Sequence, residues 1–340
     1  MNADKSEPSV LIRVNPRSMF CGDWFTFEWT PDEGLNLLRS MFIAMSRNKA
    51  LRSYSESSSL GAKLSSRFVA GMTVEDALQA AARVNAEGIA VTLDSLGESV
   101  LDPAQAQAGA DIYHELLDAI EARGLNANVS VKLSQVGMDL DPSLAESIVA
   151  GMVEHAAQAK TFVRIDMEGS EYTEATIAMT ERLYARFPGC VGTVLQAYLR
   201  RTAADAKRLV GQGIRVRLCK GAYKEPAEIA FPEKSDVDQN YSELMIYLAT
   251  SGVFCGLATH DEVIIGRMRR FVEETKLDKS KFEFQMLYGV RRDLQRKLAK
   301  EGYGVRVYIP FGPEWYPYFM RRLAERPANV LFLAKNFFKN

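Results

Sequence analysis

Eight short runs of β-forming residues alternate with amphipathic helical stretches from about Gly88 onward. The runs are Ile89–Leu93, Val129–Leu133, Phe162–Asp166, Thr193–Tyr198, Ile214–Leu218, Val253–Ala258, Phe282–Leu287 and Val305–Ile309. Regular alternation of strand and helix is typical of β-α units that build a parallel sheet. Eight such units in roughly 250 residues fit a TIM-type (βα)8 barrel, because every interval has room for one helix. The pattern therefore predicts an α/β fold of this type.

A doubly wound open sheet is the main alternative for such a pattern. That fold binds nucleotides at a Gly-x-Gly-x-x-Gly turn directly after its first strand, and no such turn follows Ile89–Leu93. The nearest pattern, Gly211-Gln212-Gly213, precedes a β-forming run and does not open a helix. The barrel is therefore the preferred prediction.

The first 85 residues have a different pattern. An aromatic segment, Trp24–Trp29, precedes predicted helices near Pro31–Ser46 and Leu60–Val69, with a predicted loop over Ser53–Ser59. Thr73 has the position of a helix N-cap, with Asp76 three residues later and an alanine-rich helix beyond. We predict that residues 1–85 form a helical arm that packs on the barrel, and that residues 86–340 form the barrel domain with a C-terminal tail. No role is predicted for residues 1–60.

Composition limits the classes of function. With 42 Lys and Arg against 43 Asp and Glu, the net charge of −1 gives no basic surface for nucleic acid. The 4 cysteines stand without a Cys-x-x-Cys pair, so neither a metal site nor a disulfide framework is predicted. No apolar run reaches the roughly 18 residues that a membrane-spanning helix needs. We predict a cytoplasmic protein.

Charged residues interrupt several runs that should be apolar in a buried parallel sheet. Because side chains alternate across a strand, charged residues two positions apart share a face, as do Arg164 with Asp166, Arg215 with Arg217, and Glu283 with Gln285. If these faces point inward, a polar layer forms near the carboxyl ends of the strands from Lys132, Asp166, Gln196, Arg217 and Gln285. Active sites of this fold lie at that end, and buried charges there must pair.

The last run leads into a helix with two adjacent arginines, Arg321 and Arg322. Guanidinium groups are planar, permanently charged and forked, so two of them can hold one small carboxylate with several hydrogen bonds. Glu325 lies at helical spacing from both and can orient them. An Arg-Arg pair alone is more often a solvated turn of an amphipathic helix, so the prediction depends on the other motifs.

Six further motifs precede the arginine helix in a fixed order. They are Val131-Lys132-Leu133-Ser134, Arg164–Glu168, Leu195–Tyr198, Arg217–Tyr223, Ala258–Asp261 and Phe284–Gly289. In this order they resemble the proline dehydrogenase family, the FAD-dependent enzymes that oxidise L-proline to Δ1-pyrroline-5-carboxylate. The resemblance covers about residues 60 to 330 and extends to the catalytic domain of the bifunctional proline utilisation proteins.

The resemblance implies a role for each matching position. Catalytic roles fall on Asp166 and on Arg217, which would lie near the flavin N5. Substrate contacts fall on Lys132, Leu287, Tyr308, Arg321 and Arg322, with Glu325 in support. Contacts with FAD fall on Met167, Gln196, Arg217, Lys220, Gly221, Ala222, Thr259 and His260. The family also implies a quinone as electron acceptor, and therefore at most peripheral contact with the inner membrane, for which Leu35–Met45 and Val330–Phe338 are candidates.

The chemistry of proline agrees with these roles. Proline carries a carboxylate and a nitrogen on an apolar ring, so its site needs fixed positive charge on one side and an apolar wall on the other. Positive charge also disfavours the ammonium form and helps the nitrogen to lose a proton before oxidation. We expect the monofunctional form of the enzyme. The oligomeric state and the selectivity for proline over hydroxyproline are left open.

Two alternatives belong to other classes of function. One is a Schiff-base lyase or aldolase on the same barrel, with Lys132 or Lys220 as nucleophile. The other is a non-enzymatic protein that binds amino acids through Arg321 and Arg322. Both lack a flavin, so the colour of the purified protein separates them from a dehydrogenase.

Overall fold

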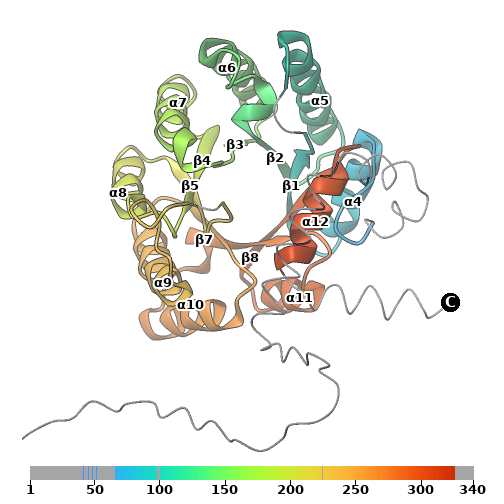
Figure 1. The fold of residues 1–340 in the computed structure, drawn as a ribbon. Helices are drawn as coiled ribbons and strands as arrows, with labels where there is room; N and C mark the ends of the chain where they lie inside the picture. The colour runs from blue at the N-terminus through green and yellow to red at the C-terminus, as the bar shows by residue number, and fades with distance from the viewer. Residues whose placement is uncertain are drawn as a thin grey trace, which may run out of the picture.

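The computed structural model describes residues 66–97, 100–223 and 225–325, preceded only by residues 41, 45, 48 and 51. For residues 321–325 it describes the backbone alone. Within these ranges, eight parallel strands pair in chain order and close into a barrel that is surrounded by helices (Figure 1). The predicted TIM-type (βα)8 fold is therefore confirmed.

Each strand pairs with the strands before and after it in the chain, and β8 closes the barrel on β1. The strands are β1 (Ala90–Ser95), β2 (Ala127–Val131), β3 (Val163–Ile165), β4 (Val191–Gln196), β5 (Arg215–Cys219), β6 (Cys255–Ala258), β7 (Phe282–Leu287) and β8 (Gly304–Phe311). The helices are α4 (Val74–Asn85), α5 (Pro103–Ala122), α6 (Pro142–Gln158), α7 (Thr173–Arg186), α8 (Thr202–Gly211), α9 (Lys234–Thr250), α10 (Glu262–Thr275), α11 (Arg292–Lys300) and α12 (Trp315–Glu325). Single turns of 3-10 helix are η1 (Leu133–Val136), η2 (Ser170–Tyr172) and η3 (Lys279–Lys281).

Every predicted β-forming run overlaps one strand. The run Phe282–Leu287 coincides with β7 at both ends. Two strands begin two residues earlier than predicted: β2 at Ala127 and β4 at Val191. Asn128 and Gly192 cause the difference, because both residue types have low strand propensity. At Gly192 the reason is steric, since a Cβ there would lie 2.2 Å from the carbonyl oxygen of Arg215.

Side chains alternate between two environments along the strands. Apolar residues such as Val91, Val129 and Leu257 are fully buried in the main core, where the helices cover the barrel. Residues between them in sequence are often polar, and some hydrogen-bond across strands that are not neighbours, as Arg217 of β5 does with Gln285 of β7. Contacts of this kind require the side chains to point into the barrel. The barrel interior is therefore polar, as the charged runs predict.

The segment before the barrel is described from Ser66 onward. Thr73 caps α4 as predicted: its hydroxyl accepts a hydrogen bond from the Asp76 amide (3.1 Å), and the Asp76 carboxylate accepts one from the Thr73 amide (3.0 Å). The helix predicted over Leu60–Val69 does not reach its predicted end, because Ser66–Phe68 form a turn. The chain then follows the end of β8, where the Ala70 amide donates to the Pro310 carbonyl (2.9 Å).

Helix α4 packs on β1 and β8, as expected of the end of the N-terminal arm. The remainder of that arm, including Trp24–Trp29 and most of Pro31–Ser46, lies outside the described residues. The predicted domain boundary at residue 85 stays a prediction.

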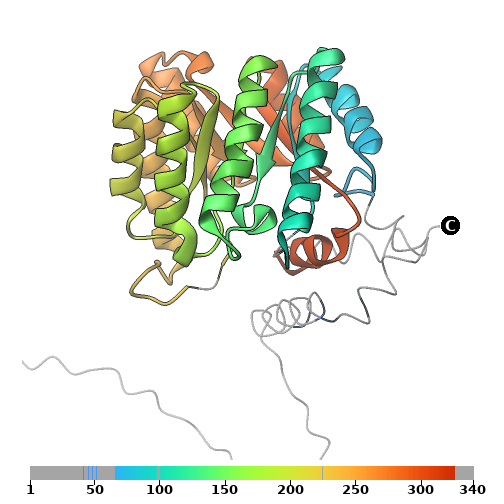
Figure 2. The same ribbon diagram turned by 90° about the horizontal axis from the view of Figure 1, so that it is seen from above.

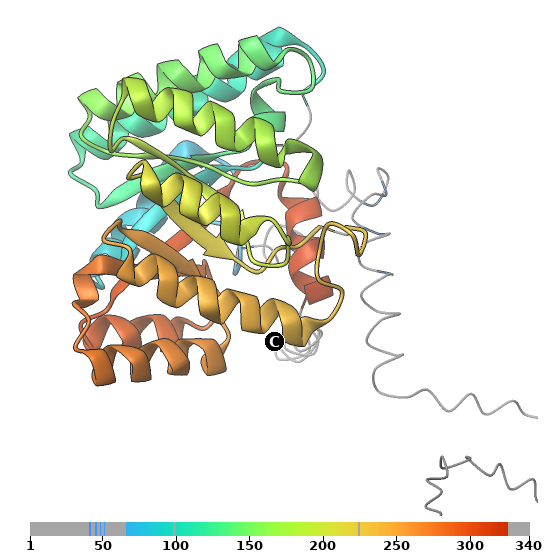
Figure 3. The same ribbon diagram turned by 90° about the vertical axis from the view of Figure 1, so that its left-hand side faces the viewer.

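Helix α12 lies across one end of the barrel, whereas α4 to α11 form its outer ring (Figures 2 and 3). Its residues Trp315, Tyr316 and Phe319 are buried in a second apolar cluster with Phe68 and Leu96. Since α12 follows β8, it covers the carboxyl end of the strands. No described helix is both long and apolar enough to cross a bilayer.

Candidate active site

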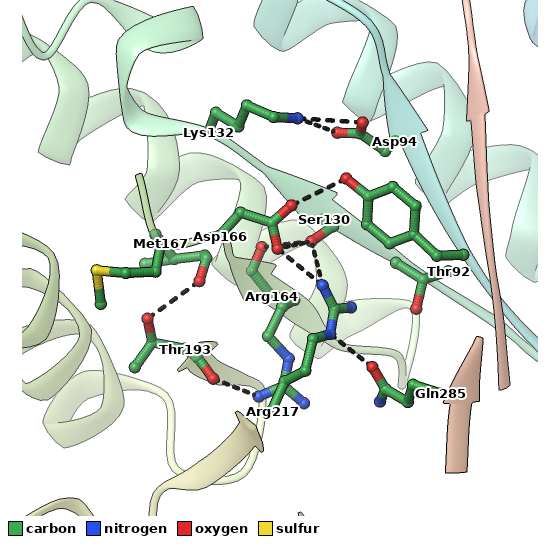
Figure 4. A network of polar contacts seen from close by, with 12 residues as sticks. Thr92, Asp94, Ser130, Lys132, Arg164, Asp166, Met167, Thr193, Arg217 and Gln285 are labelled. Atoms are coloured by element: carbon green, nitrogen blue, oxygen red, sulfur yellow. Dashed lines mark hydrogen bonds and ion pairs between the residues drawn. The ribbon is translucent and has the colours of Figure 1, made fainter. Parts of the chain in front are cut away.

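The centre of the polar layer is the ion pair between Asp166 and Arg217. The two groups lie 2.8 Å apart, and Arg217 Nε also donates to Gln285 Oε1 at 2.5 Å (Figure 4). The same carboxylate oxygen of Asp166 accepts a hydrogen bond from the Ser130 hydroxyl at 2.6 Å. Both charged side chains are largely buried, with 13% of Asp166 and 7% of Arg217 exposed. The predicted catalytic pair is thus brought together by β3 and β5, from opposite sides of β4.

Tyr308 joins this centre from β8. Its hydroxyl donates to the second carboxylate oxygen of Asp166 at 2.9 Å, and the guanidinium of Arg217 lies 5.3 Å from the centre of its ring. Burial, followed by the negative charges of Asp166 and Asp94, raises the pKa of Tyr308 well above its usual value. Tyr308 is therefore a neutral phenol that presents an aromatic surface, as its predicted substrate contact requires.

Lys132 is at the same end but forms a different pair. Its amine lies 3.1 Å from both carboxylate oxygens of Asp94, which is only 1% exposed (Figure 4). Burial raises the pKa of Asp94, and the positive charge of Lys132 opposes that rise. The predicted layer is thus correct for Asp166, Arg217 and Gln285, whereas Lys132 binds a residue that the sequence analysis did not select.

Asp94 and Ser130 are the site residues that sequence reasoning missed. A signal for Asp94 was present, because it follows Thr92 by two positions at the end of the first predicted run and so shares its inward face. Ser130 likewise precedes Lys132 by two positions. Neither residue type stands out alone, since single Ser and Asp residues are common where strands end.

Gln196 and Met167 are buried beside this centre, at the ends of β4 and β3. The Gln196 amide nitrogen donates to the Glu168 carbonyl at 3.2 Å. Its side-chain oxygen is buried without a hydrogen-bond partner in the described part of the chain, as is Nη2 of Arg217. Buried polar atoms are rarely left unsatisfied, so these two atoms indicate a place for a ligand with both donors and acceptors. The edge of a flavin ring has both, and the residues present therefore fit that group.

The predicted cofactor residues after β5 and β6 lie at the same end but are held by protein contacts. Lys220 forms ion pairs with Asp238 (2.5 Å) and Asp261 (2.9 Å). Gly221 has a φ of +110°, and a Cβ there would lie 2.2 Å from the ring of Tyr198, so only glycine fits. Ala222, the next residue, is exposed.

Thr259 and His260 follow β6. The Thr259 hydroxyl accepts a hydrogen bond from the Asp261 amide at 3.1 Å. Nε2 of His260 accepts one from the Leu287 amide at 2.9 Å, which places the predicted substrate contact Leu287 next to a predicted cofactor contact.

The two lysines weighed as Schiff-base nucleophiles are both engaged in ion pairs, Lys132 with Asp94 and Lys220 with two carboxylates. A nucleophilic lysine needs an amine that can reach the substrate carbonyl, whereas these two amines are held by carboxylates. These contacts oppose the lyase alternative.

The arginine pair is placed only by its backbone. Arg321, Arg322 and Glu325 lie in the last turns of α12, across the carboxyl end of the barrel, and their side chains lie outside the described residues. Their predicted roles stay predictions. Within the described ranges, no group of three His, Cys, Asp or Glu residues could hold a metal ion.

A charged, partly unsatisfied site at the carboxyl end of a parallel (βα)8 barrel is the arrangement of a barrel enzyme. The family model for proline dehydrogenase matches residues 77–335. The proline dehydrogenase of Deinococcus radiodurans is 43% identical over 284 residues, which are 81% of this chain and 90% of the relative. Proline dehydrogenase 1 of Bacillus subtilis is 40% identical over 305 residues, 89% of this chain and 100% of the relative. The chain therefore belongs to the proline dehydrogenase family.

A solved structure agrees with this fold. Proline utilization A from Bdellovibrio bacteriovorus, inactivated by N-propargylglycine, superposes with a TM-score of 0.75 at 24% identity, covering 92% of this chain and 39% of that chain. The resemblance found in the ordered motifs is thus confirmed. The protein is an oxidoreductase that acts on the CH–NH group of proline, in the first step of proline catabolism, and a flavoprotein.

Proposed function

We propose that this enzyme oxidises L-proline to Δ1-pyrroline-5-carboxylate with FAD as its cofactor, and that a quinone receives the electrons. The observation that carries the proposal is the pair of buried ion pairs, Lys132–Asp94 and Asp166–Arg217, at the carboxyl end of a barrel of this family. The product is the precursor of glutamate in proline degradation.

The net chemistry requires the loss of a hydride and a proton. The ring carbon next to nitrogen loses hydrogen with its bonding electrons, and the nitrogen lone pair forms the new C=N bond. The resulting iminium then loses its N–H proton to give the neutral imine. Bound FAD supplies the hydride acceptor at N5.

Substrate binding is assigned to charges on two elements. We assign the substrate carboxylate to Lys132 on β2 and to Arg321 and Arg322 on α12, because fixed cations bind a carboxylate through charge-assisted hydrogen bonds. Tyr308 and Leu287 supply the apolar wall for the ring. Glu325 is assigned to orienting the two arginines.

Asp166 is a positioning residue in this proposal. Its two oxygens accept hydrogen bonds from Ser130, Arg217 and Tyr308, at 2.6 to 2.9 Å. With three donors on its two oxygens, this carboxylate fixes the phenol and the guanidinium relative to each other. Arg217 then presents a permanent positive charge where negative charge develops during hydride transfer.

Cofactor binding is assigned to Met167, Gln196, Arg217, Lys220, Gly221, Ala222, Thr259 and His260. The two unsatisfied atoms, Gln196 Oε1 and Arg217 Nη2, support this assignment most directly. Lys220 forms two ion pairs within the protein, so we assign it to the wall of the cofactor site as a fixed group.

Electron transfer to a quinone implies access to a membrane surface. We propose a cytoplasmic enzyme that contacts the inner membrane peripherally, with Leu35–Met45 and Val330–Phe338 as candidate segments. Apart from Met41 and Met45, these residues lie outside the described part of the chain.

The proposal is tested with cofactor release and one variant. Denaturing the purified yellow protein should release FAD, identified by chromatography against FMN and riboflavin standards. Arg321→Met should keep the yellow colour but lose reduction at low proline concentration, because the carboxylate loses a cation. A colourless protein, or an Arg321→Met variant that reduces normally at low proline, would contradict the proposal.

A further inference from the structure

A cavity of about 470 Å³ opens at the other end of the barrel, where the strands begin. In Figure 2 this is the end away from α12. Its wall comes from the loops α5–β2 and α6–β3 and from the first residues of several strands, including Lys160, Phe162, Arg164, Arg215, Phe254, Glu283 and Arg306. None of these residues belongs to the site described above.

Arg164 is the unusual group in this wall. It is 3% exposed, and its Nη1 donates only to main-chain carbonyls, those of Thr193 (2.9 Å) and Arg215 (2.8 Å). Its Nε is buried without a hydrogen-bond partner among the described residues. Figure 4 shows the head group beside Thr193.

The carboxylates inside the barrel are already engaged. Asp166 pairs with Arg217 at 2.8 Å, and Glu283 pairs with Arg306 at 2.6 Å. Among the described residues, Arg164 therefore has no carboxylate within ion-pair distance. Glu283 and Asp166 attract it from farther away, while Arg217 and Arg306 repel it.

The fold makes specific room for this charge. At Gly192, on the neighbouring strand β4, a Cβ would lie 3.1 Å from Nη1 of Arg164 and 2.9 Å from the ring of Phe162. The absence of a side chain lets the guanidinium cross β4 to reach β5. It also rests on Phe162, with 4.7 Å between its central carbon and the ring centre.

The rim adds further positive charge. Arg215 is exposed and lies 5.5 Å from the centre of the Phe162 ring and 5.7 Å from that of Phe254, and Lys160 is exposed beside them. The lining contains four cations and two carboxylates, Glu121 and Glu283, and Glu283 is already bonded to Arg306. The cavity is therefore positive.

Burial, followed by the positive charge of Arg217, lowers the pKa of Arg164 well below its usual value, so the charged guanidinium is costly in this position. An unpaired buried charge costs several kcal/mol, and an anion nearby lowers that cost through a strong interaction at low dielectric. We propose that this cavity binds a small anion whose carboxylate or phosphate group lies between Lys160 and Arg215 and compensates the charge of Arg164.

The size of the cavity limits the ligand. Pockets for small molecules typically measure about 300 to 1,000 Å³, so this one has room for an organic acid or a phosphorylated metabolite and is too large for a halide alone. The site is distinct from the dehydrogenase site and does not depend on the function proposed above.

Isothermal titration of the full-length holoenzyme at low salt tests the proposal, with inorganic phosphate and succinate as separate probes. We expect at least one to bind with a dissociation constant below about 1 mM. Binding of phosphate alone identifies a phosphate ligand, and binding of succinate alone a carboxylate ligand. A crystal soaked in selenate, whose anomalous signal locates it, should show a peak in the cavity.

Two variants place any binding in this cavity. Lys160→Gln and Arg215→Gln should each weaken binding at least tenfold, while Lys207→Gln on the exposed face of α8 should leave it unchanged. The kcat for proline should be unchanged in all three. Binding of neither probe to the wild type, or equal binding by the wild type and both cavity variants, would overturn the proposal.

Discussion

The two ends of the barrel interior contain the same kinds of side chain but pair them differently. At the carboxyl end, Arg217 pairs with Asp166 and Lys132 with Asp94. At the amino end, Arg306 pairs with Glu283, but Arg164 has only main-chain oxygens as close partners in the described structure. Pairing fixes the groups that must act on a substrate. A charge left over at the opposite end requires compensation from outside the chain.

Replacing Arg217, the cation of the Asp166 ion pair, should have the largest effect on both stability and activity. Arg217→Met leaves Asp166 buried without its cation, which should cost about 3 to 5 kcal/mol of stability. It also removes the positive charge next to the reacting centre, so kcat/KM for proline should fall about 100-fold or more. Chemical denaturation and steady-state assays measure the two effects.

The matched control lies two residues earlier on the same strand. Arg215→Met removes the same group from the amino end, where it is exposed. Its kcat/KM for proline should stay within about twofold of wild type, because no reacting group lies there. Equal losses in the two variants would show that the ends are not functionally distinct.

Gly192→Ala tests whether the amino end is built around Arg164. The new Cβ would lie 2.2 Å from the Arg215 carbonyl oxygen, so the backbone must shift, at a cost of about 3 kcal/mol in the free energy of unfolding. Gly151→Ala, in helix α6 with no heavy atom within 4 Å, should instead stabilise by about 0.5 to 1 kcal/mol. A Gly192→Ala protein as stable as wild type would contradict the close packing described here.

Tyr308→Phe should have a smaller effect at the carboxyl end. It removes the hydroxyl that donates to Asp166 at 2.9 Å but keeps the aromatic wall. A typical hydrogen bond contributes about 0.5 to 1.5 kcal/mol, so kcat/KM should fall about 10-fold or less while the cofactor content stays normal. A loss as large as that of Arg217→Met would mean that the phenol takes part in the chemistry itself.

The two ends should agree in the low reactivity of their thiols, and this is the smallest of the expected effects. Burial raises the pKa of Cys219, at the end of β5, and of Cys255, at the start of β6, to about 12. At pH 8 such a thiol is deprotonated in only about 1 molecule in 10,000, so alkylation should be very slow and should accelerate about tenfold per pH unit up to pH 10. Site-resolved mass spectrometry with half-buried Cys190 as reference measures it. Alkylation of Cys219 at the rate of Cys190 would contradict the raised pKa of the Cys219 thiol.

Much of this arrangement could be predicted from the sequence because strand alternation is strict. It placed Asp166, Arg217 and Gln285 on inward faces, and these side chains do hydrogen-bond to one another. It did not give the partner of Lys132, since Asp94 is brought near by the β1–β2 register and not by a local pattern. Strand alternation also could not show that Arg164 and Asp166 serve different ends of the barrel. The two side chains share a face, but Asp166 accepts a hydrogen bond from Ser130, whereas Arg164 donates to the Arg215 carbonyl.

Other parts depend on three-dimensional packing. Glycine is required at position 192 in β4 because a Cβ there would lie 2.2 Å from the Arg215 carbonyl oxygen, which local propensity cannot reveal. The turn at Ser66–Phe68 is set by pairing of the following residues with β8. The arginine helix was identified from its motif, and its backbone lies over the carboxyl end, while the roles of its arginines stay predictions.

Anaerobic titration of the purified enzyme with L-proline tests the central claim most directly, namely that a flavin bound at the carboxyl end, beside the paired charges, oxidises proline. Visible absorption reports the flavin, and an amine reagent that traps cyclic imines reports the product. The account predicts that the flavin bands bleach as proline is added, with one imine formed for each flavin reduced, and that D-proline has no effect at the same concentration. Persistent colour with saturating L-proline, or bleaching without imine, would contradict it.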